Sequence, residues 1–320
     1  MEKKILLSAR GLSKDFPVSG KRRLHALSRV DLDIYEGETL ALVGESGCGK
    51  STLGRTLIRL VPATEGSISF EGQDISAMSE REFHPLRGKM QIIFQDPYAS
   101  LNPRMTVRDI IAEPLETHHV CATARETTQR VLELMKAAGL PAEYLYRYPH
   151  QFSGGQRQRI GIARAIALKP KLIICDEPVS ALDVSVQNQI LNLLKELQKE
   201  FGLTYLFISH DLSVVRFLSD RTCVMFLGKL CEVGNTAELY EKPLHPYTRF
   251  LLGAIPGIDP RARGEKRPLL KGELPSPIDP PSGCRFHTRC PYATERCRVE
   301  EPLMRSIGSR QVACHHCGEI

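Results

Sequence analysis

The chain has 320 residues, which is enough for one large domain or for two unequal domains with a hydrophobic core. Charged residues make up 25% of it and apolar residues 42%, a balance that excludes a disordered chain, a collagen-like repeat and a disulfide-rich miniprotein. The net charge of +6 is too small to indicate a nucleic acid as partner, and we expect none. No segment approaches the roughly 18 apolar residues of a membrane span, and the N-terminus lacks the apolar run of a secretory signal. A reduced, cytosolic protein is therefore expected.

Up to about residue 250, short apolar runs alternate with longer helical stretches, which predicts an α/β fold. Residues 172–174 are all apolar, as expected for a strand buried on both faces of a parallel sheet. Residues 106–149 show no strand pattern and predict helices interrupted at Pro114 and Pro141. Seven prolines between residues 256 and 281 cannot sustain regular structure, so a domain boundary is expected near residue 250. The predicted strands include Thr39–Val43, Met90–Phe94, Lys171–Cys175 and Thr204–Ile208.

The segment from Gly44 to Thr52 fits the phosphate-binding pattern G-x-x-x-x-G-K-[ST], and it lies between a predicted strand and a helical run, as this pattern requires. Its glycines let successive backbone N–H groups and the helix N-terminus face phosphate oxygens. Lys50 is expected to bind the β- and γ-phosphates of a nucleotide, and the Ser51 hydroxyl to bind Mg²⁺. A glycine-rich turn without a ligand is the alternative. The expected nucleotide-binding residues are Gly44, Glu45, Ser46, Gly47, Cys48, Gly49, Lys50, Ser51 and Thr52.

Two acids, Asp176 and Glu177, directly follow the apolar run that ends at Cys175. The carboxyl ends of parallel strands meet at one edge of a sheet, where phosphates bind. Asp176 is therefore expected to hold Mg²⁺, directly or through water, and Glu177 to accept a proton from the attacking water. The cap of a following helix is the alternative reading of such a pair of acids.

A second candidate anion site lies about 100 residues after the first, at Ser153, Gly154, Gly155 and Gln156. A run with helical apolar periodicity follows, so these residues describe a helix whose N-terminus is left open. An N-cap serine alone would explain Ser153, but not the Gly-Gly-Gln that follows it.

With these motifs in this order, the chain resembles the ATP-binding subunit of an ABC transporter. Ser153–Gln156 is similar to the ABC signature, with Phe152 where leucine is commoner. The segment that ends at Asp183 resembles the D-loop. Gln95 and His210, each after a predicted strand, resemble the Q-loop glutamine and the switch histidine.

The resemblance implies a P-loop NTPase fold with a RecA-like core, an N-terminal antiparallel β subdomain, a helical subdomain at about residues 100–165 and an irregular, cysteine-containing C-terminal extension. The nucleotide-binding domain would comprise residues 1–250 and the extension residues 251–320. Two such domains would pair head to tail, so that the signature of each closes over ATP held by the other. Phe16 would stack on the adenine, although a lone aromatic residue is more often part of a core.

The same resemblance assigns roles around ATP and Mg²⁺. Glu177 would activate the attacking water, and His210 would contact the γ-phosphate. Gln95 would sense that phosphate and signal to the membrane subunits. Ser51, Gln95 and Asp176 would bind Mg²⁺.

Three segments are similar to the ATPases of dipeptide and oligopeptide importers: the one beginning at His245, residues 178–187 and the cysteine-rich tail. Residues 97–104 look like the second, dipeptide-type ATPase of such a pair. The implied partners are a sister ATPase, with a homodimer as the alternative, two transmembrane permease subunits and, indirectly, an extracytoplasmic solute-binding protein. The implied location is peripheral, at the cytoplasmic face of the inner membrane. Nickel and glutathione importers belong to the same branch, so the cargo stays open.

Five of the ten cysteines lie in the last 37 residues, a density that free thiols alone do not explain. Zinc ribbons prefer C-x2-C pairs, and in the tail only Cys314 and Cys317 have that spacing. The longer gaps suit an iron–sulfur cluster at least as well, with zinc as the alternative. The resembling family carries a [4Fe–4S] cluster here, and its implied ligands are Cys284, Cys290, Cys297 and Cys314. We expect a structural clamp rather than an electron-transfer centre.

Soluble ABC ATPases of DNA repair or translation, and ABC exporters, share these motifs. Soluble ABC ATPases of DNA repair carry a long coiled coil between the phosphate loop and the signature. In this sequence only 103 positions separate Lys50 from Ser153, which leaves no room for such an insertion. Translation-type members usually join two nucleotide domains in one chain, and ABC exporters often fuse a membrane domain. This sequence shows a single set of motifs and no such fusion.

Overall fold

The computed structural model describes residues 4–20, 22–254 and 273–318, and its contacts divide the chain into two compact units. The first unit contains Tyr35–Glu38 and Ala77–Ile208, and the second contains Ile5–Ile34, Thr39–Ser76 and the chain from Ser209 onward. The expected domain boundary near residue 250 stays a prediction. The described part of the tail, residues 273–318, belongs to the same unit as the phosphate-loop motif.

The first unit is built on three parallel strands in the order β8-β7-β6. All five residues of β7 are buried, as the unbroken apolar run predicted. Met90 pairs with Leu172, which pairs in turn with Thr204, so the strands start level and their carboxyl ends lie at one edge. The strands are β6 (Met90–Ile93), β7 (Leu172–Asp176) and β8 (Thr204–Ile208), and two helices of the unit are α2 (Glu80–Arg87) and α6 (Val184–Phe201).

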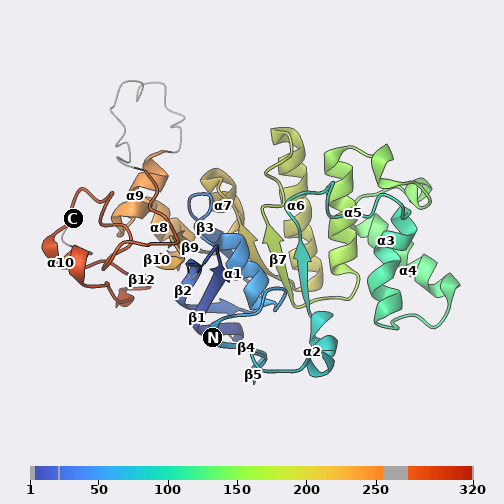
Figure 1. Ribbon diagram of the computed structural model, residues 1–320. Helices are drawn as coiled ribbons and strands as arrows, with labels where there is room; N and C mark the ends of the chain where they lie inside the picture. Colours follow the sequence, from blue (N-terminus) through green and yellow to red (C-terminus); the bar gives the residue numbers. More distant parts are fainter. Residues whose placement is uncertain (1–3, 21, 255–272, 319–320) are drawn as a thin grey trace, which may run out of the picture. The chain divides into compact units, whose positions relative to one another are not determined.

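Three further helices of this unit pack on one another: α3 (Val107–Thr117), α4 (Ala124–Ala137) and α5 (Gly154–Ile166) (Figure 1). Short 3₁₀ turns at Ala142–Tyr144 and Pro149–Gln151 join α4 to α5. The predicted interruption at Pro114 is wrong, because α3 runs through this residue to Thr117. The helix is fixed at its start by a capping box in which Thr106 and Asp109 bond to each other's backbone N–H groups.

The second unit contains two sheets. One has the order β2-β1-β4-β5, with β1 and β4 antiparallel, and it corresponds to the expected N-terminal β subdomain. The other has the order β11-β12-β10-β9-β3, in which only β3 and β9 are parallel. Its strands come from both ends of the chain. The strands of the unit are β1 (Ile5–Pro17), β2 (Arg23–Tyr35), β3 (Thr39–Val43), β4 (Glu65–Phe70), β5 (Gln73–Asp74), β9 (Arg221–Phe226), β10 (Lys229–Asn235), β11 (Arg305–Ile307) and β12 (Arg310–Val312).

The tail enters the core of this unit. Phe286 is 1% exposed and lies in one cluster with Val43 of β3, Phe226 of β9 and Tyr247. The strand β12 extends the sheet by pairing with β10, which the proline-rich sequence of the tail did not predict. The helices of the unit are α1 (Lys50–Leu57), α7 (Leu212–Leu218), α8 (Thr236–Glu241), α9 (Pro246–Gly253) and α10 (Glu295–Val299).

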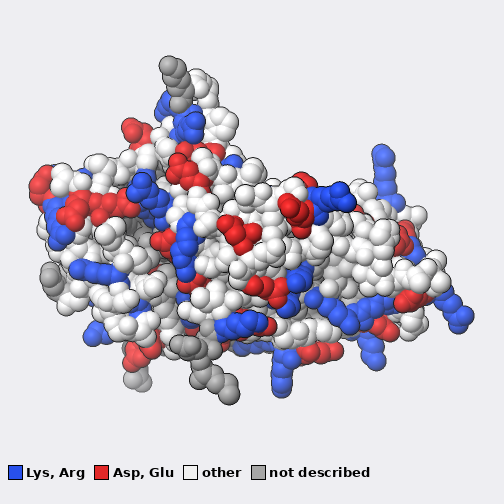
Figure 2. Space-filling model, turned by 90° about the horizontal axis from the view of Figure 1, so that it is seen from below, with Lys and Arg blue, Asp and Glu red and all other residues white. Residues whose placement is uncertain are grey.

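None of the helices in residues 4–20, 22–254 and 273–318 has the length and apolar character needed to cross a bilayer. On the face shown in Figure 2, Lys and Arg side chains are interspersed with Asp and Glu.

Candidate nucleotide site and cysteine-lined cavity

The phosphate-loop motif forms the turn between β3 and α1, the strand–loop–helix setting that the sequence predicted. The buried ammonium of Lys50 donates to the carbonyl oxygens of Gly44, at 2.8 Å, and Glu45, at 3.0 Å. Ser46 and Gly47 are exposed, while Ser51 and Thr52 are half-buried in the first turn of α1. The loop thus presents its tip to solvent and has its cation folded against its own backbone.

The Cys48 side chain points away from solvent, unlike the exposed tip of the loop. It is 1% exposed, and burial raises the pKa of its thiol, although the neighbouring Lys50 ammonium opposes that shift. The backbone carbonyl of Cys48 accepts a hydrogen bond from Gly228 at 2.9 Å, which ties the loop to the turn between β9 and β10.

In the first unit, Asp176 is the buried last residue of β7 and Glu177 follows it. Glu177 has a φ of 47°, which is uncommon for a residue with a side chain, and its N–H donates to Ile208 O at 3.1 Å. The Gln95 side-chain amide donates to Glu177 Oε2 at 3.0 Å. Two residues that the sequence assigned separately, to coupling and to proton transfer, are therefore in direct contact.

The glycine-rich motif lies at the N-terminus of α5. Ser153 Oγ accepts from the N–H of Gln156 at 3.4 Å, and the Gln156 side chain accepts from the N–H of Ser153 at 3.1 Å. The helix N-terminus that was predicted to be open is therefore capped: Ser153 and Gln156 form a capping box, in which each side chain accepts the backbone N–H of the other. A Cβ added to Gly155 would lie 2.3 Å from Val186 of α6, so packing between the two helices requires a glycine there.

Three other predicted residues lie on separate elements. Asp183 is the exposed N-cap of α6, and His210 is exposed directly after Ser209. Phe16 is half-buried near the end of β1, with the Lys14 ammonium 4.9 Å from its ring centroid. A cation over its face shows that the ring is not enclosed in a core.

Two residues that sequence reasoning missed contact the phosphate-loop motif. Arg289, from the tail, forms an ion pair with Glu45 at 2.7 Å, and the Tyr247 hydroxyl accepts from the N–H of Glu45 at 2.9 Å. Tyr247 stood in a segment noted for its family likeness, but nothing in the sequence marked Arg289.

All four predicted ligand cysteines of the tail line one small cavity, together with His245, Phe286 and Tyr292. Burial raises the pKa of Cys284 to about 12 and that of Cys290 to about 11, and it also raises the pKa of Cys314. Protonated thiols are thus favoured there in the absence of a metal. Within the described residues, no three His, Cys, Asp or Glu side chains are close enough together to hold a metal ion.

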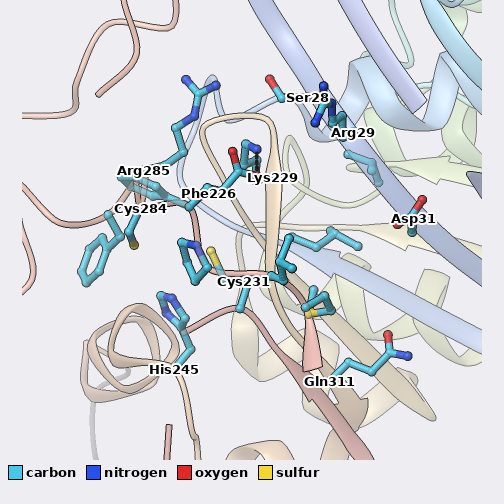
Figure 3. Close-up of a pocket in the computed structure, with 18 residues that line it drawn as sticks. Ser28, Arg29, Asp31, Phe226, Lys229, Cys231, His245, Cys284, Arg285 and Gln311 are labelled. Atoms are coloured by element: carbon cyan, nitrogen blue, oxygen red, sulfur yellow. Dashed lines mark hydrogen bonds and ion pairs between the residues drawn. The ribbon is translucent and has the colours of Figure 1, made fainter. Parts of the chain in front are cut away.

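Figure 3 shows a larger cavity in the same unit, with a volume of about 240 Å³. Its lining includes two cysteines, Cys231 and Cys284. It also includes the Lys229–Glu301 ion pair and two arginines, Arg29 and Arg285. Cys284, His245 and Phe286 line both cavities, so the two cavities lie next to each other.

Comparison with protein families matches two parts of the chain. Residues 27–180 match the ABC transporter family, and residues 231–297 match the C-terminal region of oligopeptide/dipeptide transporters. Among solved structures, the chain is similar to a dimeric ATP-binding cassette, MJ0796, in a post-hydrolysis state with ADP and Pi. The sequence identity is 32% and the TM-score 0.67, and the match covers 72% of this chain and 99% of that one.

Curated relatives match over nearly the whole length. The chain is 55% identical to the putative oligopeptide transport ATP-binding protein YkfD of Bacillus subtilis, over 97% of this chain and 95% of the relative. It is 51% identical to the oligopeptide transport protein OppF of Salmonella typhimurium (98% and 96% covered). It is 50% identical to the di/tripeptide transport protein DppF of Pseudomonas aeruginosa (98% of each chain covered). The chain is therefore a member of the family of ABC transporter ATP-binding subunits that carry the oligopeptide/dipeptide transporter C-terminal region.

Proposed function

We propose that this chain is the ATP-hydrolysing subunit of an importer of dipeptides and oligopeptides. The observation that supports this most is the similarity over 97% of the chain to relatives named for oligopeptide transport, in both the ATPase part and the tail. The geometry agrees, since the chain holds a phosphate loop with a buried lysine and a glutamate positioned by a glutamine. Nickel, glutathione or another small solute is the alternative cargo.

The proposed reaction uses Lys50 and the loop backbone to hold the phosphates of ATP. Ser51, Asp176 and Gln95 are the residues that would hold Mg²⁺, which would neutralise charge on the phosphates. Glu177 takes a proton from the attacking water, and the hydrogen bond from Gln95 orients its carboxylate. His210 contacts the γ-phosphate. The first turn of α5, at Gly154 and Gly155, supplies backbone N–H groups to ATP held by a second ATPase, so that ATP joins the two subunits.

The proposed assembly places the chain at the cytoplasmic face of the inner membrane. There it binds a sister ATPase, or a second copy of itself, and two permease subunits, which in turn receive cargo from a solute-binding protein. Isolation from membranes tests this. We expect a tagged chain to retain two multi-span subunits, and the purified complex to hydrolyse ATP faster when peptide-loaded binding protein is added. Recovery with nucleic acid or ribosomes, and without membrane subunits, would contradict the proposal.

We propose, as a finer point, that Cys284, Cys290, Cys297 and Cys314 hold a [4Fe–4S] cluster. In support, these four thiols line one cavity while the fifth, Cys317, does not, and its sulfur bonds instead to Arg305 and Cys314 O. A single zinc ion needs sulfurs about 2.3 Å from one point, whereas a four-iron cluster gives each thiolate its own iron. When bound, the cluster would be a covalent clamp on the tail.

Anaerobic purification tests the cluster directly. We expect a brown protein with an absorption band at about 400 nm and about four iron atoms per chain. Cys290→Ser is expected to lose both signals, while Cys317→Ser keeps them. One equivalent of zinc without iron would show that the cluster assignment is wrong.

A further inference from the structure

Two residues from the C-terminal part of the chain, Arg289 and Tyr247, contact Glu45 of the phosphate-loop motif. The Arg289 guanidinium bonds to both carboxylate oxygens of Glu45, with Nη1 2.7 Å from Oε2 and Nη2 3.2 Å from Oε1. The Tyr247 hydroxyl accepts the backbone N–H of the same residue at 2.9 Å. Both the side chain and the backbone of Glu45 are therefore fixed by residues more than 200 positions away.

These contacts are built into a packed core. The Arg289 side chain is only 8% exposed, and its backbone N–H donates to Phe286 O at 3.0 Å. Phe286 and Tyr247 both pack against Phe226 of β9, with ring centroids 5.3 and 4.8 Å away. A bidentate arginine–carboxylate pair has a specific geometry, and breaking one whose arginine is this deeply buried is costly because it leaves a charge without its partner.

The Glu45 carboxylate lies in the loop that is proposed to bind phosphates, so its charge affects nucleotide binding. Glu45 is an acid at the second position of a motif that binds the phosphates of ATP, and its side chain is only 27% exposed. A free carboxylate beside a polyphosphate would weaken nucleotide binding by like-charge repulsion, which is large where water is partly excluded. Its backbone carbonyl also accepts from Lys50 at 3.0 Å, so any movement of Glu45 would shift the lysine that binds phosphate.

We infer that Arg289 is a positioning residue for nucleotide binding: it neutralises Glu45 and, with Tyr247, holds the phosphate loop in its binding conformation. The tail thereby sets the affinity for ATP from outside the nucleotide motifs. Arg289 directly precedes Cys290, which lines the cysteine-lined cavity. The inference rests on the ATP binding proposed above.

The test measures the dissociation constant for ATP, at low temperature without hydrolysis, in the purified complex. Arg289→Ala should weaken ATP binding by about tenfold, equal to about 1.4 kcal/mol. Glu45→Gln removes the pair but also the repulsive charge, and should weaken binding less. The double variant Glu45→Gln/Arg289→Ala should therefore bind ATP more tightly than Arg289→Ala alone. Arg289→Lys keeps the charge but loses the bidentate hydrogen bond, so its affinity for ATP should lie between those of the wild type and Arg289→Ala.

Arg10→Ala is the matched control. It removes another arginine–carboxylate pair of the same unit, with Asp33 at 2.7 Å; the Arg10 guanidinium bonds to Ala9 O, Leu32 O and Asp33, which lie outside the phosphate loop. It should leave ATP affinity unchanged. The inference fails if Arg289→Ala binds ATP as the wild type does, or if the double variant binds no better than Arg289→Ala. A wild-type complex that binds no ATP would instead refute the proposed function.

Discussion

Replacing Glu177 with glutamine is expected to lower the rate of ATP hydrolysis by about 100-fold or more while leaving ATP binding intact. The amide keeps the size of the side chain and still accepts the hydrogen bond from Gln95, which spans 3.0 Å in the structure. It cannot, however, accept a proton from water. ATP therefore stays bound, and the two ATPases should remain joined. Single-turnover hydrolysis measures the first effect, and size-exclusion chromatography with ATP measures the second.

Glu200→Gln is the control for this substitution, because Glu200 is an exposed glutamate on α6. It should hydrolyse ATP at the wild-type rate. Near-native hydrolysis by Glu177→Gln would show that another group takes the proton. A variant that neither hydrolyses nor binds ATP would show instead that Glu177 serves to build the site.

The strands, and the setting of the phosphate-loop motif between a strand and a helix, were predictable because each rests on a local pattern. The apolar run 172–174 became the buried strand β7, and the glycines before Lys50 lie between β3 and α1. The contact between Gln95 and Glu177 follows from the same patterns, since both residues come after parallel strands that pair and end at one edge.

Features that depend on long-range packing were not predictable. Pro114 lies inside α3, although proline alone favours a break; it stands in the last turns of an amphipathic helix whose buried face offsets the lost hydrogen bond. Cys48 is buried because the chain around Gly228 covers the loop, which no local pattern indicates. The contact of Arg289 with Glu45 joins residues 244 positions apart, and one sequence holds no sign of such a pairing.

Gly49→Ala is expected to weaken ATP binding by about 100-fold, or about 2.8 kcal/mol. Gly49 is the N-cap of α1, with a φ of 105° that L side chains rarely adopt. A Cβ there would lie 2.3 Å from the carbonyl oxygen of Ala26, which is backbone and cannot turn aside. The loop cannot retreat either, because Cys48 O is hydrogen-bonded to Gly228 N. The turn, and with it Lys50, must therefore shift away from its binding position.

Gly47→Ala separates this clash from backbone strain alone. Gly47 also has a positive φ, 78°, but an added Cβ there meets no atom within 4 Å. It should therefore weaken ATP binding far less than Gly49→Ala, by no more than the cost of a left-handed residue with a side chain, about 1–2 kcal/mol. Thermal unfolding without nucleotide shows whether either variant has lost the fold. Equal losses of affinity in the two variants would mean that backbone freedom, and not the close approach of Ala26, requires glycine in this loop.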